Sequence, residues 1–153
     1  MDPAVHLLVL NGKGLDTRGE TEESRTYFRS SARLADYDAH IAATARSLGV
    51  GAEHVQTNDL NECIRLLKET KAHAIVINPA GFGKEPALAE CIAGLKKPVF
   101  EVHYGNFFAK GATSLVTASC NGLIVGAKLG SYSLGMRAAV DALTPSPFDF
   151  PPP

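Results

Sequence analysis

Short apolar runs recur along the chain, separated by longer stretches in which apolar residues return with helical spacing. Most of these runs are almost continuously apolar, which is typical of parallel strands buried on both faces of a sheet, whereas the run near residues 53–57 is mostly polar. The pattern predicts five strands, at residues 5–10, about 53–57, 74–77, a stretch that begins at residue 99, and 123–125.

The stretches between these runs predict helices. In residues 34–48 the side chains of Leu34, Tyr37, Ile41 and Ala45 share one face, and Gly49 follows as a C-cap. Further helices are predicted from the Asp59 cap to about residue 71, and over residues 86–94 and 132–143. Alternating strands and helices of this kind predict an α/β fold, a flavodoxin-like doubly wound sheet of five parallel strands.

Two segments lack such a pattern. Residues 16–31 are mostly polar, and we predict a long mobile loop there. The end of the chain, residues 144–153, is rich in proline and is predicted to be either flexible or an arm on a neighbouring subunit. Residues 1–143 are therefore predicted to form a single catalytic domain.

The composition of the chain indicates a globular protein and gives information about its partners and its setting. Of 153 residues, 45% are apolar and 20% charged, as in a globular domain, and the net charge of −1 gives no reason to expect nucleic acid or an anionic membrane as partner. The N-terminus lacks the basic region of a signal peptide. Three widely spaced cysteines predict reduced thiols and a cytoplasmic setting, and neither they nor the histidines show metal-ligand spacing.

The stretch from Val99 delivers an acid and an imidazole to the end of a buried strand. Glu101 and His103 are two residues apart, so an ideal strand places them on the same side, close enough to interact. His103 is either a functional group that titrates near neutral pH or a structural strand-end histidine. Asn78, at the end of another buried strand, is either a turn residue or a ligand-binding amide.

The polar loop also carries candidate chemistry. An Arg18 held against Tyr27 would favour the phenolate, and a phenolate on a closing loop is a plausible general base. Solvated side chains are the alternative for both residues. The Gly12/Gly14 loop lacks the full G-x-G-x-x-G pattern, so it supports dinucleotide binding only weakly.

Several short motifs follow one another along residues 5–143. They are Leu10-Asn11-Gly12, Arg18 followed by Tyr27, Gln56-Thr57-Asn58, Ile77-Asn78-Pro79, and Glu101-Val102-His103 with Asn106. In this order they resemble the type II 3-dehydroquinate dehydratases. The resemblance implies a flavodoxin-like fold, a homododecamer built from trimers, and a lyase that needs no metal and no organic cofactor. Its reaction is the anti elimination of water from 3-dehydroquinate through an enolate.

The resemblance also implies roles for individual residues. Tyr27 would remove the proton next to the ketone, and Arg18 would hold Tyr27 as a phenolate. His103 would protonate the departing hydroxyl, with Glu101 orienting its imidazole. Asn78 would bind the substrate hydroxyls.

The remaining substrate contacts are implied in the same way. Backbone N–H groups of Tyr104 and Gly105 would receive the substrate carboxylate. Lys84 stands near the place of a substrate-binding histidine and supplies charge without the same hydrogen bonds. Glu90 stands where the family carries an aspartate that reaches the site of a neighbouring subunit.

The sequence departs from the family at other positions. Lys13-Gly14 replaces a Pro-Asn pair, Gly105 replaces a serine, and the spacing from Arg18 to Tyr27 is longer than in the family. The basic residue that the family carries beyond the His-x-x-Asn segment has no match at residues 113–115. A changed specificity for a related hydroxylated cyclic acid or ketone, or a non-catalytic protein that binds a small acid, therefore remain alternatives to the dehydratase.

Overall fold

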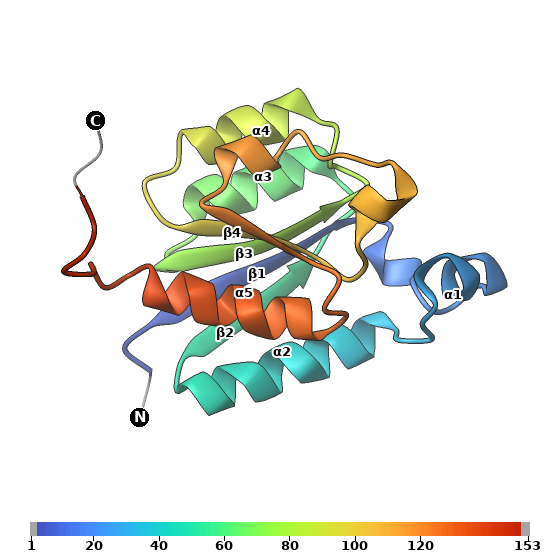
Figure 1. Ribbon diagram of the computed structural model, residues 1–153, viewed down its shortest axis with the longest axis horizontal. Coiled ribbons are helices and arrows are strands. Elements are labelled where there is room, and N and C mark those ends of the chain that lie inside the picture. The colour runs from blue at the N-terminus through green and yellow to red at the C-terminus, as the bar shows by residue number, and fades with distance from the viewer. Residues whose placement is uncertain (1–2, 151–153) are drawn as a thin grey trace.

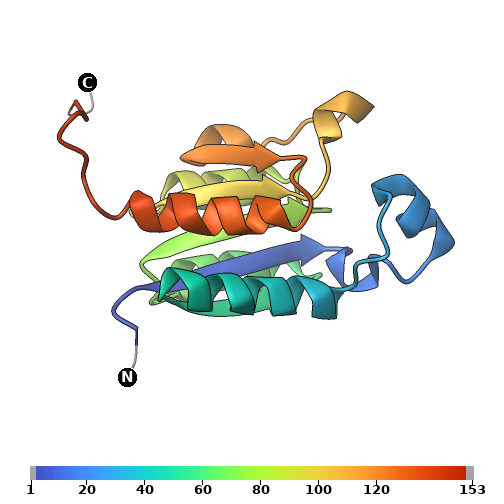
Figure 2. The ribbon, with the colours of Figure 1, turned by 60° about the horizontal axis from the view of Figure 1, so that its bottom comes forward.

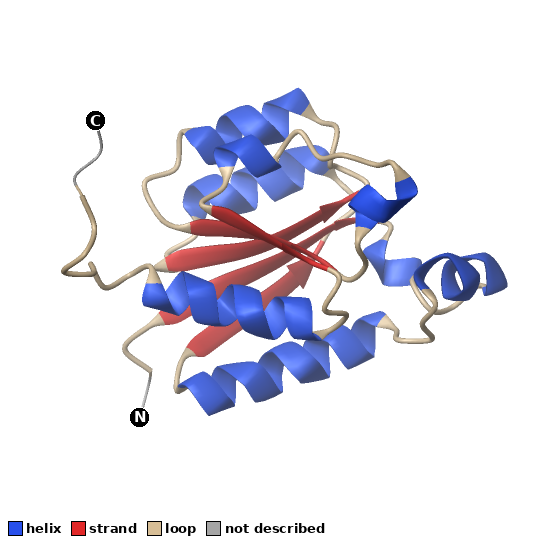
Figure 3. Ribbon diagram, viewed as in Figure 1, coloured by secondary structure: helices blue, strands red, loops and turns tan. Residues whose placement is uncertain are grey.

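The protein is built on one sheet of five parallel strands. The computed structural model describes residues 3–150. The strand order is β2-β1-β3-β4-β5, which confirms the predicted flavodoxin-like sheet (Figure 3). The strands are β1 (His6–Lys13), β2 (Gly51–Gln56), β3 (Ala74–Ala80), β4 (Val99–His103) and β5 (Gly122–Val125).

Helices cover both faces of this sheet. α2 (Leu34–Leu48) and α5 (Gly130–Asp141) lie on one face, and α3 (Leu60–Glu69) and α4 (Pro86–Ala93) on the other (Figure 1). In β1, successive side chains point to opposite faces of the sheet, so the strand contributes to the core on each face. Its Leu7 and Val9 belong to the core under α2 and α5, whereas Leu8 and Leu10 belong to the core under α3 and α4.

The helix ends follow the local chemistry of the sequence. The Asp59 side chain accepts hydrogen bonds from the backbone N–H groups of Asn61 and Glu62 at the start of α3. Gly49 ends α2 with a φ of 69°, and Pro86 occupies the first turn of α4. All three features were predicted from the sequence and are confirmed.

The prediction of a long mobile loop at residues 16–31 was wrong about its secondary structure. A 3-10 turn, η1 (Leu15–Thr17), and a helix, α1 (Glu22–Phe28), occupy most of this segment. Thr21 caps α1 by accepting a hydrogen bond from Ser24 N–H. α1 buries none of its residues, so its sequence carries no apolar stripe from which a helix can be predicted.

Functional candidates gather at the carboxyl ends of the strands. α1 and the short 3-10 helix η2 (Phe107–Lys110) both lie at that end of the molecule (Figure 2). A second short turn, η3 (Thr117–Ser119), leads into β5. Crevices outside the carboxyl ends of parallel strands are where such sheets bind ligands.

Two of the predictions concern the ends of the chain. Residues 1–2, on which the prediction of a missing leader partly depends, and residues 151–153 of the predicted tail lie outside the described part. Phe148 and Phe150 of the tail are almost fully exposed. Within residues 3–150 no helix combines the length and the apolar character needed to cross a bilayer.

Close packing of α5 on the sheet gives a test of the fold. A Cβ added at Gly135 would lie 2.5 Å from Val102 Cγ1 in β4. We therefore expect Gly135→Ala to lower the free energy of unfolding by about 1–3 kcal/mol through overpacking, measured by urea denaturation. Gly130→Ala in the same helix is the control, because its Cβ would meet nothing closer than 3.7 Å. Equal stability of the two variants would contradict the packing described for α5.

Candidate active site

Glu101 and His103 form the centre of the site at the end of β4. The Glu101 side chain is fully buried, and its Oε2 lies 2.5 Å from His103 Nε2. Its other oxygen, Oε1, accepts a 2.5 Å hydrogen bond from Thr117 Oγ1. The predicted approach of the two side chains along the strand is therefore present, and Thr117 closes the second side of the carboxylate.

The electrostatics of Glu101 fix the proton on His103. Burial alone would raise the pKa of Glu101, but hydrogen bonds from His103, Thr117 and Ser114, together with the charge of His103, outweigh it and hold that pKa below its usual value. An ionised carboxylate can only accept hydrogen bonds, so Nε2 of His103 carries a proton and donates it to Glu101. Nδ1 is then the ring nitrogen left for other chemistry.

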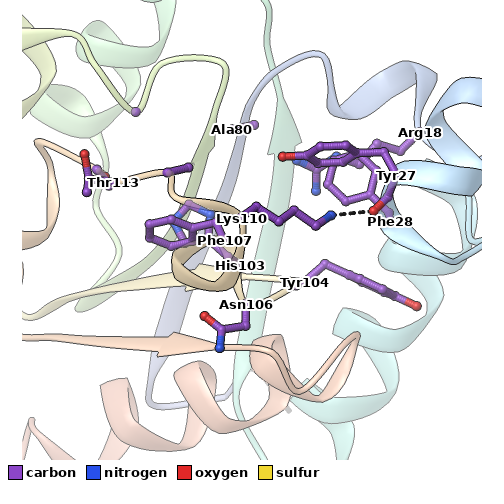
Figure 4. Close-up of a pocket in the computed structure, with 14 residues that line it drawn as sticks. Arg18, Tyr27, Phe28, Ala80, His103, Tyr104, Asn106, Phe107, Lys110 and Thr113 are labelled. Carbon is purple, nitrogen blue, oxygen red and sulfur yellow. Dashed lines mark hydrogen bonds between the residues drawn. The ribbon is translucent and has the colours of Figure 1, made fainter.

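A pocket opens beside His103. The ring of Phe107 lies against the imidazole, with ring centroids 4.3 Å apart (Figure 4). Aromatic and small side chains make up much of the wall, with the cations of Arg18 and Lys110 among them. The lining residues are Arg18, Tyr27, Phe28, Ala80, Gly83, His103, Tyr104, Gly105, Asn106, Phe107, Lys110, Ala112, Thr113 and Ser114.

Tyr27 reaches the pocket from α1. Its side chain is half exposed and packs edge-on against Phe28, with ring centroids 4.8 Å apart. The ammonium of Lys110 lies 3.5 Å from the Tyr27 ring centroid and also donates a hydrogen bond to the Tyr27 carbonyl (Figure 4). The structure thus brings Tyr27 and His103 to one pocket, as the sequence predicted.

Arg18 lines the same pocket, but its contacts are with other aromatic residues. Its guanidinium lies 4.2 Å from the ring centroid of Phe28. Burial raises the pKa of Tyr37, and the charge of Arg18 and its hydrogen bond to Tyr37 partly oppose that rise. The expected pairing of Arg18 with Tyr27 is therefore replaced by contacts with Phe28 and Tyr37.

Asn78 is buried beneath the pocket and does not line it. Its amide nitrogen donates to the Tyr132 hydroxyl at 2.9 Å, and its amide oxygen accepts from the backbone N–H of Ala80 at 3.0 Å. Ala80 does line the pocket, with a left-handed φ of 48°. Tyr132 donates onward to Asn11 Oδ1 at 2.5 Å, so Asn78 links the ends of β3 and β1 through α5.

Of the other residues predicted to contact the substrate, some line the pocket and some do not. Tyr104 and Gly105 line the pocket, although the Tyr104 hydroxyl points away and donates to Ser30 at 2.8 Å. Lys84 is exposed and donates a hydrogen bond to Thr113, which does line the pocket. Glu90 is exposed on α4 and is not among the lining residues.

Among the residues of the site that the sequence did not predict are Lys110, Thr117 and Phe107. Lys110 stands four positions after Asn106, whereas a basic residue was sought only at residues 113–115. Thr117 lies 16 residues from its partner Glu101, and no local pattern links the two. Phe107 had no signal beyond its place next to Asn106.

Across residues 3–150, no three His, Cys, Asp or Glu side chains are grouped so that they could hold a metal ion. The three cysteines are free thiols, and burial raises the pKa of both Cys63 and Cys120 to about 12. These two thiols are therefore poor nucleophiles near neutral pH.

Comparison with known proteins places this geometry among relatives. Residues 5–140 match the model of the family described as dehydroquinase class II. Proteins named 3-dehydroquinate dehydratase from Shewanella sp. (strain MR-4) and Desulforudis audaxviator (strain MP104C) are 33% and 34% identical to this chain. Those alignments cover 90% and 92% of this chain, and 96% and 95% of the relatives.

Solved structures are similar as well. The type II dehydroquinase from Propionibacterium acnes is 27% identical, with a TM-score of 0.78 over 95% of this chain and 100% of that one. A 3-dehydroquinate dehydratase-like protein from Bifidobacterium longum is 25% identical, with a TM-score of 0.67 over 91% and 98% of the two chains.

The buried carboxylate leads to a test by mutation and pH. Thr117→Val removes the Thr117 hydroxyl that donates to Glu101 Oε1, and we expect the free energy of unfolding at pH 7 to fall by about 1–3 kcal/mol. The folded-state pKa of Glu101 lies below its ordinary value of 4.5, so its contribution to stability is present above pH 4.5 and is lost as pH falls through the folded-state pKa. In Thr117→Val this loss should begin at higher pH.

Urea denaturation between pH 3 and pH 7 measures both effects. Thr113→Val is the matched control, because Thr113 is exposed and bonds Lys84 rather than Glu101. If the two variants lose stability equally at every pH, the proposed anchoring of Glu101 by Thr117 is wrong.

Proposed function

The chain belongs to the class II dehydroquinase family, and we propose that it removes water from 3-dehydroquinate to give 3-dehydroshikimate. The observation that carries the proposal is the pair of Glu101 and His103 at the end of β4, facing a pocket that also holds Tyr27. An elimination needs a base for a carbon-bound proton and an acid for the departing hydroxyl, and this pocket offers one candidate for each.

Tyr27 is the proposed base. The phenolate oxygen takes the proton from the carbon next to the ketone, and the electron pair of that C–H bond forms the enolate. The enolate then expels the hydroxyl group at the far end of the new double bond. Cations beside the pocket favour the negative charges in these steps, and Arg18 and Lys110 both line it.

His103 is the proposed acid. Its Nε2–H donates to Glu101, which leaves Nδ1 to carry the second proton of an imidazolium. Nδ1 gives that proton to the departing hydroxyl, so the leaving group is water. The hydrogen bond from Nε2–H to Glu101 holds the ring in one orientation during the transfer.

The substrate carboxylate is proposed to bind at the strand end. Tyr104 and Gly105 follow His103 directly and line the pocket, so their backbone N–H groups are suitable donors for an anion. Lys84 would act from outside the pocket through its contact with Thr113.

A changed substrate is a second candidate, and Asn78 favours it. Its amide is occupied by Tyr132 and by the Ala80 backbone, which leaves it poorly placed to recognise ring hydroxyls. Phe107, Gly83 and Ala112 are apolar parts of the wall. A related cyclic acid or ketone with fewer hydroxyl groups suits such a wall better than a polyhydroxylated ring does.

Assembly belongs to the same proposal. We infer from the family resemblance that trimers of this chain form a dodecamer in the cytoplasm. Glu90, exposed on α4, would then reach the site of a neighbouring subunit.

Turnover of 3-dehydroquinate, followed by the absorbance of the enone product, tests the proposal. His103→Ala and Tyr27→Phe should each lower kcat by about 10²–10⁴-fold, because each removes one partner of a proton transfer. His73→Ala is the control, since this exposed histidine lies before β3 at the opposite end of the sheet. No turnover by folded wild-type protein at millimolar substrate would contradict the proposed reaction, and an unchanged rate for Tyr27→Phe would place the base elsewhere.

A further inference from the structure

A row of hydrogen bonds runs from the molecular surface to the wall of the pocket. It joins side chains of α2, β2, β1 and α5 to the end of β3. The two asparagines in the row are fully buried, whereas the carboxylate at its outer end is 67% exposed. The members of this hydrogen-bond row, in order from the surface, are Asp38, His54, Asn11, Tyr132, Asn78 and the backbone N–H of Ala80.

The outer end of the row fixes the tautomer of His54. Its Nδ1 lies 2.9 Å from Asp38 Oδ1, and a carboxylate can only accept hydrogen bonds, so Nδ1 carries a proton. Its Nε2 lies 2.7 Å from the amide nitrogen of Asn11, which can only donate. Nε2 is therefore an unprotonated acceptor, and the ring is neutral, with the tautomer opposite to the one that Glu101 selects in His103.

The next hydrogen bonds of the row all run in the same direction. The Asn11 nitrogen donates to His54, so the Asn11 oxygen accepts from the Tyr132 hydroxyl at 2.5 Å. Tyr132 in turn accepts from the amide nitrogen of Asn78 at 2.9 Å. Burial raises the pKa of Tyr132, so its hydroxyl keeps the proton that it donates. Hydrogen bonds ordered in this way polarise one another, and the orientation of each amide is set by its neighbours.

The inner end of the row supports a turn in the pocket wall. The Asn78 oxygen accepts from the Ala80 N–H at 3.0 Å, and Ala80 lines the pocket (Figure 4). The left-handed φ of 48° is unfavourable for a residue with a Cβ, so this turn depends on the contacts that hold it. The Ala80 carbonyl accepts from the N–H of Gly83, a second lining residue, at 3.1 Å. An Asn78 amide in the reverse orientation would present its nitrogen to the Ala80 N–H and lose this support.

We propose that His54 is a positioning residue for the pocket. Its unprotonated Nε2, oriented by Asp38, sets the direction of the hydrogen-bond row and so aims the Asn78 oxygen at the Ala80 N–H. The three groups between His54 and Ala80 are each able to donate or to accept, so none of them sets a direction by itself. The two ends of the row do, because a carboxylate only accepts and a backbone N–H only donates. A benefit to substrate binding rests on the proposed function, in which this pocket holds the substrate.

Nuclear magnetic resonance tests both ends of the row without turnover. Long-range ¹H–¹⁵N correlation should show His54 protonated at Nδ1 and unprotonated at Nε2 in the neutral ring. Hydrogen exchange of the Ala80 N–H should be about tenfold faster in His54→Leu, which leaves the Asn11 amide without an acceptor. His54→Gln should restore slow exchange, because its oxygen can accept from Asn11 while its nitrogen donates to Asp38. The N–H of Val76, a buried residue of β3, is the internal control for a loss of global stability.

Asp38→Asn changes the outer end of the row at an exposed position, so it is the folded comparison if His54→Leu does not fold. The new amide can donate to the imidazole as well as accept from it, so both tautomers of His54 become populated and Ala80 exchanges faster than in the wild type. Glu53→Gln, at an exposed position of β2, is the control for the loss of one negative charge and should leave Ala80 exchange unchanged.

Kinetics supply a second readout. In His54→Leu the KM should rise about tenfold with a smaller change in kcat, because the pocket wall is loosened and both partners of the proton transfers remain. Ala80 exchange that is the same in wild type, His54→Leu and Asp38→Asn would overturn the role of His54, as would a neutral His54 ring protonated at Nε2. Faster Ala80 exchange in these variants of a protein without turnover of 3-dehydroquinate would contradict only the proposed reaction.

Discussion

The site depends on burying one carboxylate without leaving its charge unpaired. Removing a carboxylate from water costs several kcal/mol, and breaking a buried pair leaves that cost uncompensated. Glu101 avoids this because donors approach both oxygens, His103 from its own strand and Thr117 from the segment before β5. The same arrangement that makes the burial tolerable also fixes the His103 ring and decides which nitrogen faces the pocket.

The two halves of the proposed proton transfer are held in different ways. His103 extends from β4, a strand that is hydrogen-bonded on both sides within the sheet. Tyr27 extends from α1, which has no buried residue and is held by cation–aromatic contacts and a few hydrogen bonds. A fixed acid and a loosely held base suit a site that must open for its ligand and then exclude water.

Much of this fold can be predicted from the sequence, because β1 and β3 are apolar over most of their length and α2 to α5 each bury an apolar stripe. The approach of Glu101 and His103 follows from their spacing along one strand. α1 could not be predicted, because it packs against no core. The roles of Thr117 and Lys110 depend on how distant segments fold back on β4 and α1, and Asn78 was ambiguous because its partner Tyr132 is 54 residues away.

The central claim is that the ionised Glu101 holds the Nε2 proton of His103 and leaves Nδ1 for chemistry. Long-range ¹H–¹⁵N correlation NMR of histidine-labelled protein measures the protonation of each ring nitrogen directly. We expect His103 Nε2 to carry a proton and Nδ1 to be unprotonated in the neutral ring, because Nε2 donates to the ionised Glu101. An unprotonated Nε2 beside a protonated Nδ1 in the neutral ring would contradict this claim.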